Sequence, residues 1–188
     1  KHIMGGFAVP AGQYYPSAVN GYDPDVERPA YNPEKAKQLL KEAGYEDGFT
    51  VTLDSPNDRY INDEKIAQAV ASSLAKIGIT VKVNAIPKAS FFPKANDTDS
   101  SFNLIGWACS DGDGSAFLDG CVHTYDQDKG YGRYNGGRYS NPEVDALIEK
   151  SATVLDAEER EKLLIEAMHL ALLEEQNIIP LHYQVDLY

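Results

Sequence analysis

The sequence has no long hydrophobic run and few basic residues. No apolar stretch among its 188 residues approaches the roughly 20 that a membrane-spanning helix needs, so we expect no membrane insertion. The chain carries 17 basic and 29 acidic residues, and its net charge of -12 argues against nucleic acid or an anionic membrane as a partner. This balance mildly favours neutral or cationic ligands.

The chain also lacks the common motifs for metals, cofactors and catalysis. It has no H-E-x-x-H, no P-loop, no G-x-S-x-G and no G-x-G-x-x-G. The acidic stretch that begins at Asp111 resembles the start of an EF-hand loop, but Ala116 and Val122 stand where that loop needs Gly and Glu. We therefore expect neither a metal nor a cofactor.

Cysteine is scarce, because Cys109 and Cys121 are the only two and form no C-x-x-C pair. A zinc knuckle or a redox pair is therefore not indicated. The two residues could form a disulfide in an oxidising compartment, or they could be two separate buried thiols.

The remaining composition is that of a folded protein. Hydrophobic residues make up 43% and charged residues 24%, which predicts a packed core. The length fits one ordinary domain or one lobe of a larger protein.

Periodicity predicts alternating strands and helices in the first half of the chain. Separation of strands by helical crossovers favours a largely parallel or mixed sheet flanked by helices, which is an α/β fold. Residues 7–29 read as an extended surface segment and 119–139 as a binding lid or a structured excursion. The predicted strands are 49–53, 79–85, 102–108 and a short edge strand at 178–181, and the predicted helices are 32–43, 62–77, 87–94, 141–151 and one that starts at 156.

The candidate site follows the predicted strand 102–108. In open parallel sheets, ligands bind at the carboxyl ends of the strands. Trp107, Asp111 and Asp113 lie there, and Arg59 and Tyr60 lie in the loop that follows the predicted strand 49–53. An aromatic face beside carboxylates suits a cationic organic ligand such as a peptide amino terminus. The alternative is a core tryptophan followed by a solvated acidic turn.

Several segments together resemble one known family, the bacterial extracellular solute-binding proteins of the peptide and nickel ABC importers. The similarity extends over nearly the whole chain, in the same order and with the same spacing. The segments that carry it are Leu39-Leu40 with Gly44-Tyr45 and Asp47-Gly48-Phe49, then 75–81, Gly106-Trp107, 138–145, 156–160 and 179–181.

This resemblance implies a two-lobed receptor of the type II periplasmic-binding-protein kind, located in the periplasm or anchored outside the cell membrane. Residues 1–188 would form a single ligand-binding lobe, the second of the two, with the rest of the protein absent. The receptor would be a monomer that binds an oligopeptide or another small solute without catalysis. It would then deliver that solute to the transmembrane permease of an ABC importer. Peptides, nickel complexes, glutathione and sugars all occur as ligands in the resembled family.

The resemblance also assigns roles within the loop. In dipeptide-binding members, an aspartate after Gly-Trp pairs with the amino terminus of the ligand. Ser110 occupies that position here, and Asp111 follows one place later. The ligand-binding candidates are therefore Trp107, Ser110, Asp111, Asp113, Arg59 and Tyr60.

Two other functions stay open from the residues alone. One is a hydrolase-type enzyme domain that uses Asp111, Asp113 and His123. The other is a purely structural or interaction module.

Overall fold

The computed structural model describes residues 3–97 and 100–185, which form two compact units. The first unit comprises residues 3–5 and Ala30–Gly106, and the second comprises Gly6–Pro29 and residues 107–185. The interpretation of residues 1–188 as a single lobe stays a prediction.

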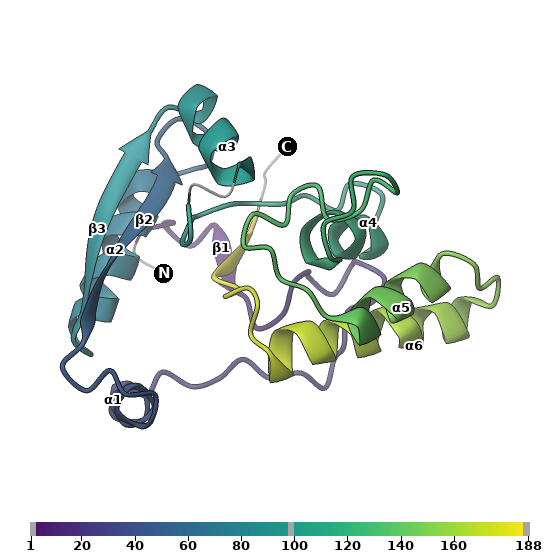
Figure 1. Ribbon diagram of the computed structural model, residues 1–188, viewed down its shortest axis with the longest axis horizontal. Helices are drawn as coiled ribbons and strands as arrows, with labels where there is room; N and C mark the ends of the chain where they lie inside the picture. Colours follow the sequence, from purple (N-terminus) through teal and green to yellow (C-terminus); the bar gives the residue numbers. More distant parts are fainter. Residues whose placement is uncertain (1–2, 98–99, 186–188) are drawn as a thin grey trace. The chain divides into compact units, whose positions relative to one another are not determined.

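A two-stranded parallel sheet forms the centre of the first unit (Figure 1). Strands β2 (Phe49–Pro56) and β3 (Ile79–Ile86) pair along their whole lengths, and helix α2 (Asp63–Ala75) connects them. Leu53 and Ile79 are buried on one face of this sheet, whereas the alternate side chains of Thr50 and Lys82 are exposed. Because side chains alternate between faces, the sequence pattern predicts a parallel pair with one covered side, although Asp54, on the same face as Thr50, is also buried.

Two further helices belong to this unit. Helix α3 (Lys88–Asn96) follows β3 and contacts β2. Helix α1 (Pro33–Glu42) begins as predicted, with the Asn32 side chain accepting a hydrogen bond from the amide of Lys35 at 2.9 Å. None of the α1 residues is buried, and Leu39 is 53% exposed.

The predicted buried strand at residues 102–108 is wrong. This segment is extended but makes only one isolated bridge, between Asn103 and Asp54. The amide of Asp54 donates to the carbonyl of Phe102 at 3.0 Å, and the amide of Leu104 donates to the carbonyl of Asp54 at 2.9 Å. Beyond Leu104 the chain is exposed, because it leaves β2 before a ladder can form.

Helices pack together in the second unit. Helices α5 (Pro142–Ser151) and α6 (Ala157–Met168) contact each other, and α6 continues into a π-helical stretch, η2 (His169–Glu174). A short helix α4 (Ser115–Phe117) runs into a second π-helical stretch, η1 (Leu118–Val122). No helix in the described part of the chain is long and apolar enough to cross a membrane. The fully buried side chains of this core include Leu118, Val122, Val144, Ile148, Leu164 and Met168.

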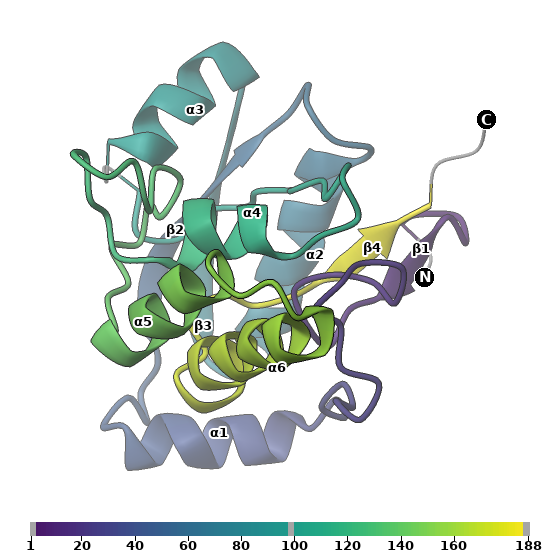
Figure 2. The same cartoon turned by 90° about the vertical axis from the view of Figure 1, so that its right-hand side faces the viewer.

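The predicted surface segment at residues 7–29 is partly wrong. It contains strand β1 (Ala8–Pro10), which pairs antiparallel with β4 (His182–Gln184) (Figure 2). Tyr15 in this segment is 1% exposed and belongs to the core of the second unit. The strand expected at 178–181 begins later, after Pro180, because proline has no amide hydrogen to donate to a ladder.

Candidate functional site

Arg59 and Tyr60 lie in the loop between β2 and α2, in the first unit. The Asp63 carboxylate shapes this loop, since its Oδ2 accepts hydrogen bonds from the amides of Arg59 and Tyr60, both at 3.0 Å. The Arg59 guanidinium lies 5.0 Å from the centroid of the Tyr60 ring, which is within cation–π range. Asp63 was not among the residues predicted from the sequence, although an acidic residue at a helix start is a recognisable signal.

Tyr60 also contacts the extended segment that ends the first unit. Its hydroxyl donates to the carbonyl of Gly106 at 3.2 Å. A Cβ at position 106 would lie 2.9 Å from the Tyr60 ring, so the absence of a side chain permits this approach. Ile105 is 43% exposed. The amides of Ile105 and Gly106 donate to no other residue that the structure describes, so these N–H groups can pair with a ligand.

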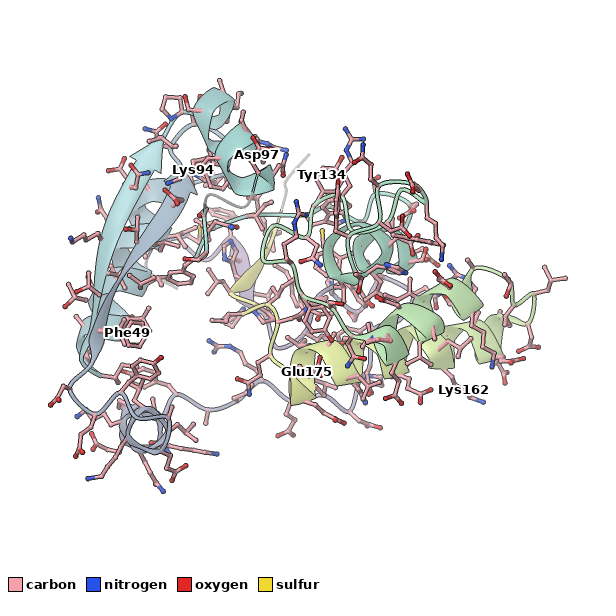
Figure 3. The ribbon with its side chains drawn as sticks, in the orientation of Figure 1. Phe49, Lys94, Asp97, Tyr134, Lys162 and Glu175 are labelled. Atoms are coloured by element: carbon pink, nitrogen blue, oxygen red, sulfur yellow. The ribbon has the colours of Figure 1, made fainter. Side chains whose placement is uncertain are left out.

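A buried charge network lies at the carboxyl end of β2, and sequence reasoning missed it. Asp54 is 2% exposed, and its Oδ1 accepts hydrogen bonds from Asn84 Nδ2 and Lys94 Nζ, both at 2.6 Å. Its Oδ2 accepts from the Ser100 hydroxyl, also at 2.6 Å. Figure 3 shows Lys94 on α3, beside the end of β2.

The electrostatic balance in this network favours the ionised carboxylate. Burial raises the pKa of Asp54, but the hydrogen bonds from Lys94, Ser100 and Asn84 outweigh it and hold the pKa below the ordinary value. Because Asp54 also pairs through its backbone with residues 102–104, the network anchors the segment that leads to Gly106.

Trp107 belongs to the second unit and is 40% exposed. Its indole packs edge-on against two rings, with centroid distances of 6.0 Å to Phe117 and 5.2 Å to Tyr134. Phe117 is buried and belongs to the core of the unit. Phe117 in the core and Tyr134 therefore pack against the indole, and Trp107 stays partly exposed.

Asp113 is held by a partner that the sequence reasoning did not find. Arg160 on α6 makes two hydrogen bonds to its carboxylate, NH1 to Oδ2 at 2.6 Å and NH2 to Oδ1 at 2.9 Å. Asn20 Nδ2 donates to Oδ2 at 3.0 Å, and the amide of Ser115 donates to Oδ1 at 2.9 Å. The Arg160 hydrogen bonds hold the pKa of Asp113 well below its usual range. This carboxylate is occupied by the fold.

Ser110 and Asp111 are both exposed on the same loop. The Asp111 carboxylate accepts one hydrogen bond, from the amide of Asp113 at 3.2 Å, and pairs with no cation among the residues that the structure covers. Trp107, Ser110, Asp111 and Asp113 thus share one unit, whereas Arg59 and Tyr60 belong to the first. Asp111 is the carboxylate of this loop with unused acceptor capacity.

His123 is buried rather than presented to a substrate. It is 4% exposed, stacks on the Tyr131 ring at 4.1 Å between centroids, and its Nδ1 lies 2.7 Å from the carbonyl of Thr124. Its nearest carboxylates are those of Asp145 and Glu149, each 3.5 Å away. Because Asp113 is bound to Arg160 and His123 is buried, the groups Asp111, Asp113 and His123 offer no free nucleophile–base pair for a hydrolase.

Cys109 and Cys121 are free, half-buried thiols at the edge of the second core. Burial, and to a lesser extent the nearby Cys109, raise the pKa of Cys121 to about 12. A disulfide between the two side chains stays a prediction.

Comparison with known proteins identifies the family. The sequence profile of the bacterial extracellular solute-binding proteins, family 5 Middle, matches residues 1–129. The chain belongs to this family. Its members are binding proteins and not enzymes, and they act outside the cytoplasm, in agreement with the sequence-based expectation.

Two curated family members and one solved structure illustrate the similarity. The chain is 33% identical over 121 residues to the dipeptide-binding protein of Escherichia coli, covering 63% of this chain and 23% of that protein. It is 29% identical over 160 residues to heme-binding protein A of Haemophilus influenzae, covering 81% of this chain and 28% of that protein. The periplasmic binding protein DppA from Helicobacter pylori, in complex with the peptide STSA, superposes with a TM-score of 0.84 at 28% identity, covering 96% of this chain and 34% of that one.

The α/β fold expected from the sequence and from the family is confirmed by these comparisons. The chain of this family 5 member spans about a third or less of the length of the relatives that it matches.

Proposed function

We propose that this chain is the ligand-binding part of a two-lobed receptor for an ABC importer. The receptor binds a peptide or a similar small solute between its lobes and delivers it to the permease. Membership of the extracellular solute-binding family supports this role. Relatives named for a dipeptide and for heme show that the family alone does not name the solute.

The observation that carries the proposal is the exposed indole of Trp107 on a segment that also carries the exposed, unpaired carboxylate of Asp111. A tryptophan that served only the core would be covered, whereas this indole is held on one side and 40% exposed. Asp111 supplies the negative charge for a ligand ammonium, because Arg160 already neutralises Asp113. Asp113 therefore acts as a support of the loop, and Ser110 contributes a hydroxyl.

The exposed backbone before Trp107 supports a peptide-like ligand. The unpaired amides of Ile105 and Gly106 lie on an extended stretch, which is the arrangement that an extended peptide can join by strand-like hydrogen bonds. Tyr60 holds the Gly106 carbonyl from one side. The absent lobe would complete the site and close over the solute.

The test uses the full-length receptor that carries this chain. Native mass spectrometry after incubation with a tryptic digest of casein should detect retained peptides. The double variant Trp107→Ala/Asp111→Asn should lose at least about tenfold in affinity, since it removes a stacking face and a charge-assisted hydrogen bond. The control variant Asp128→Asn changes an exposed carboxylate elsewhere and should bind as the wild type does. Unchanged affinity in the double variant would remove this site assignment.

A further inference from the structure

A second exposed aromatic side chain lies against Trp107. Tyr134, which is labelled in Figure 3, is 39% exposed. Its ring meets the indole of Trp107 edge-on at 60°, with 5.2 Å between the centroids. The two residues are far apart in the sequence, and no motif connects them. Together they form a wider aromatic surface than either ring alone.

The backbone holds Tyr134 in this place. Its amide donates to the carbonyl of Gly120 at 2.8 Å, and the amide of Gly132 donates to the carbonyl of Asp119 at 2.8 Å. The buried Asn135 side chain donates to the carbonyl of His123 at 3.1 Å. These contacts fix the Tyr134 segment against η1, so the aromatic surface is part of the folded unit.

The rings of Trp107 and Tyr134 both lie against Gly120. A Cβ built there would lie 3.2 Å from Tyr134 Cδ2 and 3.5 Å from the distal edge of the Trp107 indole. Lack of a side chain at this position lets the two rings approach each other over the backbone.

An unpaired cation covers Tyr134. The Arg133 guanidinium lies 5.6 Å from the Tyr134 ring centroid and is exposed. Arg160 in the same unit pairs with Asp113, and Arg138 lies over Tyr125, whereas Arg133 makes no ion pair with any residue in the described ranges. A planar guanidinium held over a ring and free of carboxylates is suited to bind a carboxylate of a ligand.

We propose that Arg133 and Tyr134 extend the solute site and select peptides that carry an acidic side chain. This inference rests on the proposed function. The Tyr134 ring contacts the Trp107 indole and the Arg133 guanidinium lies over Tyr134, so a ligand that stacks on the indole would bring a side chain to this pair. Arg133 binds the side-chain carboxylate, and the ring of Tyr134 packs on the methylene groups beside it.

Isothermal titration of the full-length receptor with Ala-Glu and Ala-Gln tests this assignment. The two probes are nearly isosteric and differ in one charge. We expect Ala-Glu to bind at least about tenfold more tightly, as loss of a charge-assisted hydrogen bond predicts. Arg133→Gln should abolish the preference, and Arg133→Lys should restore part of it because the charge returns without the planar fork. Lys162→Gln, at an exposed position on α6 that pairs with no carboxylate among the residues that the structure describes, should keep the full preference.

Other outcomes overturn the assignment in distinguishable ways. Equal affinity for Ala-Glu and Ala-Gln, or an unchanged preference in Arg133→Gln, refutes the acidic subsite while the receptor function stands. Binding of casein peptides without binding of either probe does the same. Failure to retain any peptide refutes peptides as the solute, and failure to retain any small solute in native mass spectrometry refutes the proposed function as well.

Discussion

Replacement of Lys94 by Met should remove the cation that neutralises the buried carboxylate of Asp54. The Lys94 ammonium lies 2.6 Å from Asp54 Oδ1, and the Asp54 side chain is 3% exposed. Lys94→Met keeps most of the apolar stem of the side chain and deletes the charge. Ser100 and Asn84 still donate to the carboxylate, so its hydrogen bonds are only partly lost.

The magnitude follows from the burial of the charge that remains. Removal of one partner of a buried ion pair costs about 3–5 kcal/mol, because the other charge stays desolvated and unpaired. The Lys94 side chain is 31% exposed, and two hydrogen bonds to Asp54 survive, so we expect a loss near the lower limit, about 3 kcal/mol of unfolding free energy at pH 7.

The pH dependence gives the sharper signature. In the wild type the pKa of Asp54 is lowered on folding, so its stabilisation is fully present above the unfolded pKa of about 4 and is lost as the pH falls through the folded value. Without the Lys94 ammonium, burial dominates and the folded pKa rises above the unfolded one. The penalty in the variant is then largest at pH 7 and shrinks as the pH falls towards 4.

Urea denaturation followed by circular dichroism at pH 7 and pH 4 measures both effects. Lys82→Met on the exposed face of β3 is the matched control and should stay within about 0.5 kcal/mol of the wild type. The double variant Lys94→Met/Asp54→Asn should recover stability at pH 7, since no buried charge is left. An equal loss for Lys94→Met at both pH values would contradict the electrostatic reasoning, and a loss no larger than that of the control would do so too.

Two further predictions concern the second unit. Arg160→Met should lower the free energy of unfolding by about 1–2 kcal/mol, because the half-buried Asp113 loses its bidentate partner. The control Lys162→Met on the same helix should change this free energy by less than about 0.5 kcal/mol, and urea titration at pH 7 compares the two variants. If Cys109 and Cys121 form a disulfide, protein from an oxidising compartment that is unfolded without reductant should show no free thiol, and it should show two free thiols after reduction. Two free thiols before reduction would refute the disulfide.

Local signals in the sequence predicted most helices and strands correctly. Asn32 and Asn141 each precede a proline and cap the helix that follows, and Asp156 accepts a hydrogen bond from the amide of Glu159 at 2.8 Å. Alternation in β2 and β3 predicted a parallel pair connected by a helix. These features depend on neighbouring residues, so they can be read without a tertiary structure.

The errors occurred where distant contacts decide the conformation. Residues 102–108 have the composition of a strand, but among the described residues only Asp54 offers them backbone partners. The segment 7–29 is rich in proline and glycine, yet Tyr15 reaches the core and β1 pairs with a strand near the other end of the chain. Neither fact has a local signal in the sequence.

The features of the candidate site also fall into two groups, those with a local signal in the sequence and those that depend on distant contacts. Trp107, Ser110 and Asp111 could be proposed from the sequence because they follow one short segment, in which Gly106-Trp107 resembles the family and Ser110 stands where dipeptide-binding members have an aspartate. The partner of Asp113, the Asp54 network and the contact of Tyr134 with Trp107 were not recognisable. Ion pairs and ring contacts depend on side chains brought together from distant positions.

The sequence alone determined the family, the α/β class and the loop that carries the indole and the acids, because caps, alternation and short motifs are local properties. Only the tertiary structure decided which carboxylate is free and which is held, since that depends on where Arg160 reaches from α6. It also decided that Tyr134, with Arg133 over its ring, lies next to the Trp107 indole. The hydrogen bonds to Gly120 and Asp119 that hold this segment join residues that are distant in the sequence.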